Sequence, residues 1–242
     1  MARTKTVFLS AEWRDLVMLN YEVDPRLLDK YVPYGTVLDS FRGRTYVSLV
    51  GFRFCRTKLF GSLSVPLHSD FDEVNLRFYV RRQEGDESRR GVVFIAEIVA
   101  KQAVATMARL IYGENYVCLP MRHHICTDGP KKTVEYQWQV KNQWCRLTAQ
   151  AMGAPEIPRE GSLEKFITEH YWGYSTQRGG GSLEYHVSHV PWHVWVSTTA
   201  GFKGDASGLY GVELGRALQC HPSSAFIADG SPVTVFKGRK LP

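Results

Sequence analysis

One stretch of this chain carries most of the information about its fold: Ala108-Arg109-Leu110-Ile111-Tyr112-Gly113-Glu114-Asn115-Tyr116. Its first half completes a helical pattern over Ala103–Tyr112, and Gly113 is a suitable C-terminal glycine. Polar residues follow the glycine directly. No lysine occurs between Lys101 and Lys131, so this polar segment has no side-chain amine.

Upstream, Phe71-Asp72-Glu73-Val74-Asn75-Leu76-Arg77 belongs to a set of apolar or alternating segments rich in Val, Ile, Tyr and Phe. Such segments are typical of β-strands. We predict strands over Leu16–Val23, Arg44–Phe54, Val74–Arg82, Gly91–Ala100, Thr133–Val140, Trp144–Ala151, Leu183–His189 and Val194–Thr199. Gly85–Ser88 is expected to be a hairpin tip, because its residues tolerate turn conformations.

Helices are expected to be few. Asp24–Val32 begins with a capping acid followed by proline and ends before Pro33, which predicts a helix. Ser162–Ile167 predicts another, with Ser162 as its cap. Many strands with few short helices indicate an α+β or closed-barrel fold that is mostly antiparallel β, not a doubly wound sheet.

A chain of 242 residues is within the range of one large β-rich domain or of two small ones, and it can bury a sizeable core. We predict a single domain over residues 1–242. The hydrophobic content of 44% and the charged content of 22% are typical of a globular protein. Gly153–Gly161 is rich in Pro and Gly, and we expect it to separate two halves of one β core.

The charge pattern argues against nucleic-acid binding. The net charge is +6, but the basic residues form small clusters at expected turns and no stripe with interleaved aromatics. The five cysteines have irregular spacing without CxxC, which favours reduced thiols in a cytoplasmic protein. No window approaches 18 consecutive apolar residues, so no membrane span is expected.

Several motifs together resemble the YqjF-like family of uncharacterised bacterial proteins (domain of unknown function 2071), within the acetoacetate-decarboxylase-like superfamily. The resemblance extends from about Phe8 to Val196. It is carried by the segments Leu38–Val47, Glu73–Val80, Gly91–Phe94, Ala108–Tyr116, Thr168–Tyr171 and His189–Trp192. It implies a cone-like, closed antiparallel β-barrel with a few short flanking helices and a pocket in its interior, which can enclose one small ligand.

The resemblance also implies what chemistry is missing. In the decarboxylase two adjacent lysines stand where this chain has Asn115-Tyr116, and one of them attacks the substrate carbonyl. Neither a carboxamide nor a phenol can form an imine with a ketone. We therefore expect no Schiff-base decarboxylation here.

The same resemblance indicates candidate site residues. Glu73 corresponds to a pocket glutamate, and burial without a cation would raise its pKa and let it act as an acid or base; the alternative is an ion-paired or solvent-facing loop carboxylate. Arg14 corresponds to an active-site arginine that could hold a carboxylate, unless it pairs with Glu12 or Asp15 nearby. Tyr116 or Asn115 takes the place of the nucleophilic lysine.

Asn75 and Arg77 alternate with Glu73 and would share one face of a strand. That face either lines the pocket with ligand-binding groups, or it faces solvent while the apolar residues Val74, Leu76 and Phe78 enter the core.

A metal site is not expected. His186 and His189 face opposite sides of a strand, and Pro191 interrupts the chain before His193. No cofactor is implied either.

Three functions are compatible with the sequence. The first is a protein that binds a small anionic or carbonyl-bearing molecule, with Glu73 and Tyr116 reacting or orienting it and Arg14, Asn75, Arg77 and Asn115 binding it. The second is an enzyme using acid–base chemistry on the same scaffold, such as a decarboxylase-like enzyme, hydratase, isomerase or lactone hydrolase. The third is a dimeric interaction protein, a possible homo-oligomer, whose dimer or partner face would be formed by Trp172, Tyr174, Trp192 and Trp195.

Overall fold

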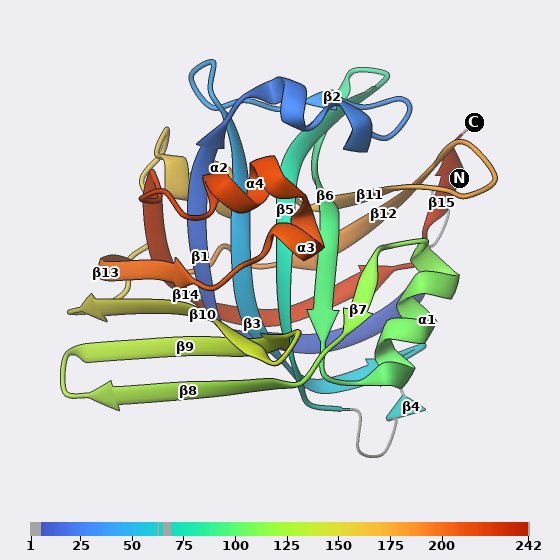
Figure 1. Ribbon diagram of the computed structural model, residues 1–242. Coiled ribbons are helices and arrows are strands. Elements are labelled where there is room, and N and C mark those ends of the chain that lie inside the picture. Colours follow the sequence, from blue (N-terminus) through green and yellow to red (C-terminus); the bar gives the residue numbers. More distant parts are fainter. Residues whose placement is uncertain (1–5, 62, 65–68, 242) are drawn as a thin grey trace.

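The structure is a computed structural model that describes residues 6–61, 63–64 and 69–241 (Figure 1). Its strands are β1 (Val7–Val23), β2 (Val37–Leu38), β3 (Thr45–Leu59), β4 (Leu63–Ser64), β5 (Phe71–Glu84), β6 (Glu87–Val99), β7 (Tyr116–Cys118), β8 (Met121–Asp128), β9 (Lys131–Val140), β10 (Gln143–Met152), β11 (Trp172–Thr176), β12 (Ser182–His189), β13 (Val194–Lys203), β14 (Ser224–Phe236) and β15 (Arg239–Leu241). Its helices are α1 (Gln102–Tyr112), α2 (Leu163–Thr168), α3 (Ser207–Tyr210) and α4 (Val212–Ala217). The expectation of a mostly antiparallel β fold with a few short helices is confirmed.

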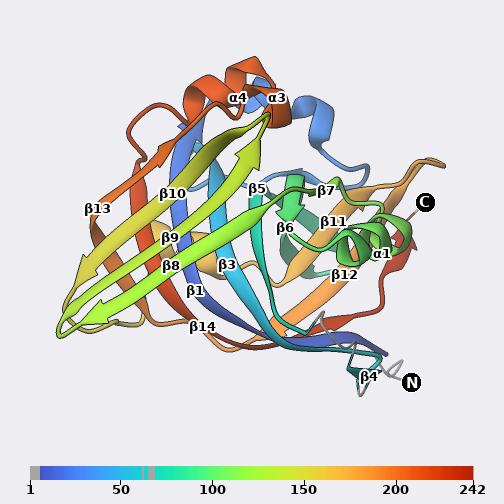
Figure 2. The ribbon, with the colours of Figure 1, turned by 60° about the horizontal axis from the view of Figure 1, so that its bottom comes forward.

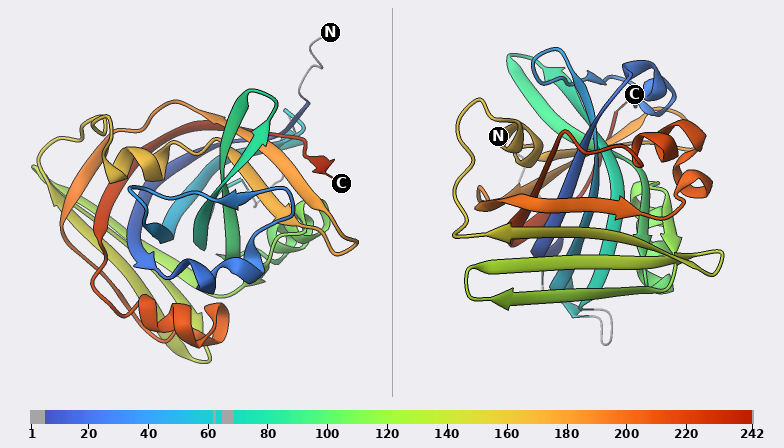
Figure 3. Two further views of the ribbon diagram at one scale, coloured as in Figure 1. Left: turned by 90° about the horizontal axis from the view of Figure 1, so that it is seen from above. Right: turned by 60° about the vertical axis from the view of Figure 1, so that its left-hand side comes forward.

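The strand pairings form a path that returns to its start. The order β14-β1-β3-β5-β6-β11-β12 is hydrogen-bonded throughout, and β12 pairs with β14 as well as with β11. Along this path only β11 and β6 run parallel, through two residue pairs. Figure 3 shows the path from above, with its strands arranged around an interior. This arrangement gives β1, β3 and β5 one face toward that interior and one face toward the outside.

A second layer covers the outer face of these strands. From β14 the sheet continues through β13, β10 and β9 to β8, and this arm runs across β1, β3 and β5 (Figure 2). Gly51 of β3 lies at the crossing, where an added Cβ atom would stand 2.7 Å from the ring of Tyr136 and 3.0 Å from Leu147. The absence of a side chain at Gly51 therefore lets the two layers approach closely. Between them lies the largest apolar core, which includes Val74, Leu76 and Phe78.

The helices differ in part from those expected. Ser162 caps α2 as predicted, with its hydroxyl accepting a hydrogen bond of 3.2 Å from the backbone N–H of Lys165. Gly113 closes α1 in the left-handed conformation. The single helix predicted over Asp24–Val32 is wrong, because the segment forms two 3-10 turns, η1 (Pro25–Leu27) and η2 (Asp29–Tyr31). Among the described residues, no helix combines the length and apolar character required to cross a lipid bilayer.

Candidate functional site

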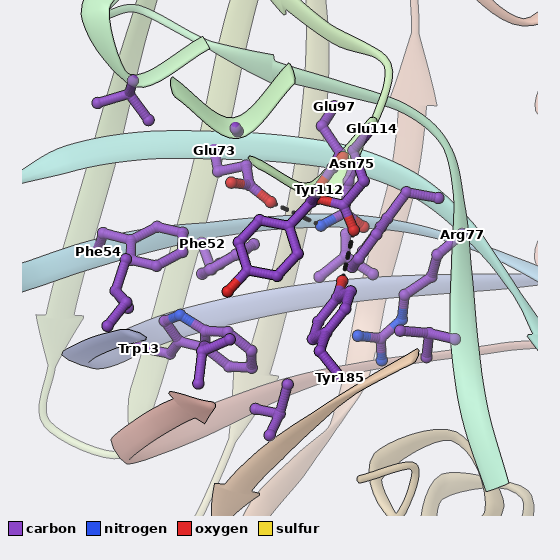
Figure 4. A pocket seen from close by; sticks show the side chains of 18 of the residues that line it. Trp13, Phe52, Phe54, Glu73, Asn75, Arg77, Glu97, Tyr112, Glu114 and Tyr185 are labelled. Carbon is purple, nitrogen blue, oxygen red and sulfur yellow. Dashed lines mark hydrogen bonds between the residues drawn. The ribbon is translucent and has the colours of Figure 1, made fainter. Parts of the chain in front are cut away.

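A cavity of about 160 Å³ lies inside the ring of strands. Its walls are mostly apolar, and aromatic rings are prominent among them: Trp13, Phe52, Phe54, Phe71, Tyr112 and Tyr185. A cavity of this volume is large enough to hold one small organic molecule. A small number of polar side chains stand among these rings (Figure 4). The cavity therefore has the form of a small-molecule site, apolar with a few directed polar groups.

Strand β5 supplies three of the polar groups. Glu73, Asn75 and Arg77 all line the cavity, and each is buried, with exposures of 2%, 1% and 8%. The residues between them point the other way, into the core beneath β9 and β10. Strand alternation places the three polar residues on one face. Because the β8–β10 arm covers the opposite face, neither side of β5 is open to solvent between Glu73 and Val80.

The carboxyl group of Glu73 is held on both oxygens. Asn75 Nδ2 donates to Oε1 at 3.0 Å, and the Tyr116 hydroxyl donates to Oε2 at 3.1 Å. Burial raises the pKa of Glu73 to about 7, although these hydrogen bonds and the charge of Arg77 act in the opposite direction. A carboxyl group with a pKa near neutrality is suited to gain or lose a proton at physiological pH.

Two further acids stand beside this pair. Glu97 comes from β6 and Glu114 from the segment between α1 and β7, and each carboxyl group affects the pKa of the other. The Tyr185 hydroxyl donates to Glu114 Oε1 at 2.5 Å. Burial raises the pKa of Glu114 to about 8. Burial, together with the neighbouring carboxyl groups of Glu114 and Glu73, also holds the pKa of Glu97 well above its usual range.

Arg77 is the cation of the cavity wall. Its Nη2 atom lies 3.3 Å from the carbonyl oxygen of Ile167 and 3.9 Å from the sulfur of Met18. Its guanidinium stands 5.7 Å from the ring of Tyr79, which is the next inward-facing residue of β5. Among the described residues no carboxylate forms an ion pair with Arg77. A buried guanidinium without a carboxylate partner can receive the anionic group of a ligand.

Two of the residues expected at the site lie elsewhere. Arg14 does not line the cavity; its side chain is 39% exposed and forms an ion pair with Glu12, with a distance of 2.8 Å between Arg14 Nη2 and Glu12 Oε2. The reason is strand alternation, because its neighbour Trp13 points inward. Asn115 is also outside the lining, and its side chain donates to the carbonyl oxygen of Ile95 at 3.1 Å.

No lysine occurs among the described residues that line the cavity. Lys101 is the residue before α1, and Lys132 is bonded to Asp15 at 2.7 Å. The cavity wall described here therefore supplies no amine that could form an imine with a bound ketone.

Sequence reasoning missed Glu97, Glu114, Tyr112 and Tyr185. A signal for one of them was present. Glu97 is an acid inside the otherwise apolar run of β6, and such a residue must be paired or functional when it is buried. Tyr185 gave no such signal, since tyrosine is common in strands.

Comparison with known proteins places these features in a family. Residues 10–232 match the sequence model of the family described as "Uncharacterized conserved protein", domain of unknown function 2071. The chain belongs to this family. It is 24% identical over 184 residues to the uncharacterized protein YqjF of Bacillus subtilis, and the match covers 74% of this chain and 72% of that protein. The family predicted from the sequence motifs is thus confirmed.

Two solved structures show the fold at low sequence identity. The acetoacetate decarboxylase of Legionella pneumophila superposes with a TM-score of 0.67 at 14% identity, covering 98% of this chain and 88% of that one. The enduracididine biosynthesis enzyme MppR, solved in complex with pyruvate, gives a TM-score of 0.67 at 15% identity and covers 100% of this chain and 93% of that one. The family member described here therefore has the acetoacetate-decarboxylase-like fold.

Proposed function

We propose that this protein binds a small carboxylate-bearing molecule inside its ring of strands, which acts as a closed barrel, and that it does so without covalent capture by an amine. The observation that carries the proposal is that Arg77 and the hydrogen-bonded pair Glu73–Tyr116 line the same apolar cavity. Arg77 would bind the carboxylate. Glu73 and Tyr116 would orient a second polar group of the ligand.

The energetics of the cavity support this role. Arg77 is 8% exposed, and its guanidinium has no carboxylate partner among the described residues. The group has therefore lost contacts with water without gaining an ion pair. A ligand carboxylate would supply that partner through charge-assisted hydrogen bonds, which are stronger than neutral ones. A related fold that has been solved with pyruvate shows that such a scaffold can hold a small keto acid.

The experiment is thermal unfolding of the full chain with a panel of small organic acids. An acid present at about 100 times its Kd stabilises the folded state by about 2.7 kcal/mol, which raises the melting temperature of a chain of this size by roughly 5–10 °C. We expect Arg77→Gln to remove this shift. Arg14→Gln is the matched control, because Arg14 lies outside the cavity and its loss should leave the shift intact.

The proposal would be abandoned if no acid shifted the wild-type protein, or if Arg77→Gln bound the acids as tightly as the wild type does. A lysine imine trapped by borohydride in the presence of a keto acid would contradict the non-covalent part of the proposal.

One observation favours an enzyme on the same scaffold as the second candidate. The pKa of Glu73 near 7 and its contact with Tyr116 suit proton transfer to or from a bound ligand, as in an isomerase or hydratase. Glu73→Gln keeps the shape of the side chain but cannot exchange the proton. A turnover that Glu73→Gln retains in full would exclude this assignment.

The third function considered, an interaction protein, receives less support. Tyr174 and Trp192 are fully buried, and Trp172 and Trp195 are half-buried. These rings therefore do not form an exposed aromatic face for a partner.

A further inference from the structure

The cavity has two chemically different ends. Arg77 marks one of them, and the acids Glu73, Glu97 and Glu114 mark the other (Figure 4). Glu73 and Arg77 are four residues apart in β5, which corresponds to roughly 13 Å along an extended strand. The guanidinium lies 5.7 Å from the ring of Tyr79, which follows Arg77 on the same face of β5, and 3.3 Å from the carbonyl oxygen of Ile167. A ligand that contacts both ends must therefore be longer than a three-carbon keto acid.

The hydrogen-bonding atoms without a protein partner also differ between the ends. At the acid end, Asn75 Oδ1 and Glu97 Oε2 are buried and have no hydrogen-bond partner among the described residues, and each of these two residues is 1% exposed. The amide nitrogen of Asn75 is committed to Glu73, so the oxygen of Asn75 remains as an acceptor. At the other end Arg77 Nε, which can only donate, has no acceptor in the part of the chain that the structure describes. A complementary ligand therefore needs donors at one end and acceptors at the other.

The acid end has the composition of a site for an organic cation. Tyr112, Tyr116 and Tyr185 line the cavity together with the three carboxyl groups, and the buried Tyr112 hydroxyl has no hydrogen-bond partner within the described ranges. Ring faces and carboxylates both attract an ammonium group. Among the described residues no group of three His, Cys, Asp or Glu side chains has the arrangement of a metal site. These features favour an ammonium group with several N–H donors over a metal ion.

We propose that the acid end binds the protonated amine of the ligand while Arg77 binds its carboxylate, so that the ligand is an amino acid whose two charged groups stand at opposite ends of an apolar chain. The inference rests on the proposed function and specifies its ligand class. A carbonyl group at the acid end would leave Asn75 Oδ1 without a donor, whereas an ammonium group offers three.

The elevated pKa values of the acids agree with this assignment. Burial raises the pKa of Glu114 to about 8, and no cation among the described residues opposes this shift. An entering ammonium group would supply that cation and favour the ionised acids. The apolar walls between the ends, such as Phe52 and Val50, suit the methylene chain of the ligand.

The test compares ω-amino acids with methyl-ended acids of the same length in full-length protein. The probes are 5-aminopentanoate and 6-aminohexanoate, with hexanoate and heptanoate as their respective isosteres. Binding is measured by calorimetry and by thermal shift. We expect at least one amino acid to bind about tenfold or more tightly than its isostere, because one charge-assisted hydrogen bond contributes about that factor.

Two variants test the two ends of the cavity independently. Glu97→Gln should erase the preference for the amino acid while retaining the binding of the methyl-ended acid. Arg77→Gln should weaken both members of each pair. If Glu97→Gln does not fold, as judged by circular dichroism, Glu114→Gln provides the same comparison.

Two results would overturn the inference alone: an isostere that binds wild-type protein as tightly as its amino acid in both pairs, or a preference that survives both Glu97→Gln and Glu114→Gln. In those cases carboxylate binding would still stand. If none of the four probes and no acid of the panel bound, the proposed function would fail together with the inference.

Discussion

At Glu73, Glu97 and Glu114, three carboxyl groups share a cavity whose walls are otherwise largely hydrocarbon. Desolvation is the largest cause of the raised pKa of each. The folded chain therefore holds protons that the unfolded chain releases once the pH passes the ordinary glutamate pKa of 4.5. Stability decreases with rising pH wherever the folded state binds more protons. These groups thus contribute a loss of stability between pH 4.5 and about 8.

We expect Glu114→Gln to reduce this pH dependence. The amide keeps the shape of the side chain but does not titrate, so the free energy of unfolding should decrease less steeply than in the wild type between pH 5 and pH 8. Urea unfolding at several pH values measures this pH dependence of the free energy of unfolding. Glu213→Gln, on the exposed surface of α4, is the control and should follow the wild-type slope. Equal slopes for Glu114→Gln and the wild type would show that Glu114 does not hold its proton on folding.

At the scale of single elements, β11 shapes the cavity because one of its residues, Gly173, has no side chain. Gly173 lies opposite Tyr185 in the β11–β12 pairing, and a Cβ atom built on it would stand 2.1 Å from Tyr185 Cζ. The ring of Tyr185 thus lies directly over the backbone of β11. Its hydroxyl reaches Glu114 from this position. Gly173 of β11 therefore determines where the side chain of Tyr185 in β12 meets Glu114, which follows α1.

Gly173→Ala should displace the Tyr185 ring and weaken its hydrogen bond to Glu114. Forcing extra atoms into a packed site costs about 1–3 kcal/mol, which denaturant unfolding would detect. Gly179→Ala serves as the control, since no atom lies within 4 Å of a Cβ built there. A loss of stability no larger for Gly173→Ala than for Gly179→Ala would mean that Tyr185 moves aside without cost.

At the scale of the whole molecule, Glu184 of β12 joins strands that are distant in the sequence. It is 2% exposed and accepts from Arg82 of β5 at 3.3 Å, Arg89 of β6 at 2.9 Å and Arg239 of β15 at 2.8 Å. The Tyr174 hydroxyl of β11 donates to it at 3.1 Å. One carboxylate therefore ties the β5–β6 hairpin and the C-terminal strand to the segment where the ring of strands closes.

Glu184→Gln should destabilise the whole fold by about 2 kcal/mol, because three guanidinium groups lose their shared buried carboxylate and keep only the more exposed Glu84 or Glu87. Glu22→Gln is a matched control at an ion pair with Arg44 that is largely exposed, where the loss should be no more than about 1 kcal/mol. Thermal and urea unfolding measure both. Similar losses in the two variants would show that the Glu184 cluster does not hold the ring together.

Part of the fold was missed because local signals opposed it. No strand was predicted over Ser224–Phe236, because Gly230 and Pro232 are both poor strand formers. In the structure this segment is β14, which pairs with β1, β12 and β13. Pairing with neighbours on both sides outweighs the local preference. Gly230 has φ of +79° where β14 passes Trp13, a backbone conformation that side chains rarely adopt.

The sequence alone determined what depends on near neighbours: the main strands, α1 and α2, the family, and the shared face of Glu73, Asn75 and Arg77. These follow from periodicity and motifs, which act over a few residues. Only the tertiary structure decided that this face lines a cavity, that Arg14 and Asn115 lie outside it, and that Glu97, Glu114 and Tyr185 join it. The physical reason is that both faces of β5 are covered, and the covering strands come from distant parts of the chain. Which polar groups meet is therefore set by strand pairing and layer packing.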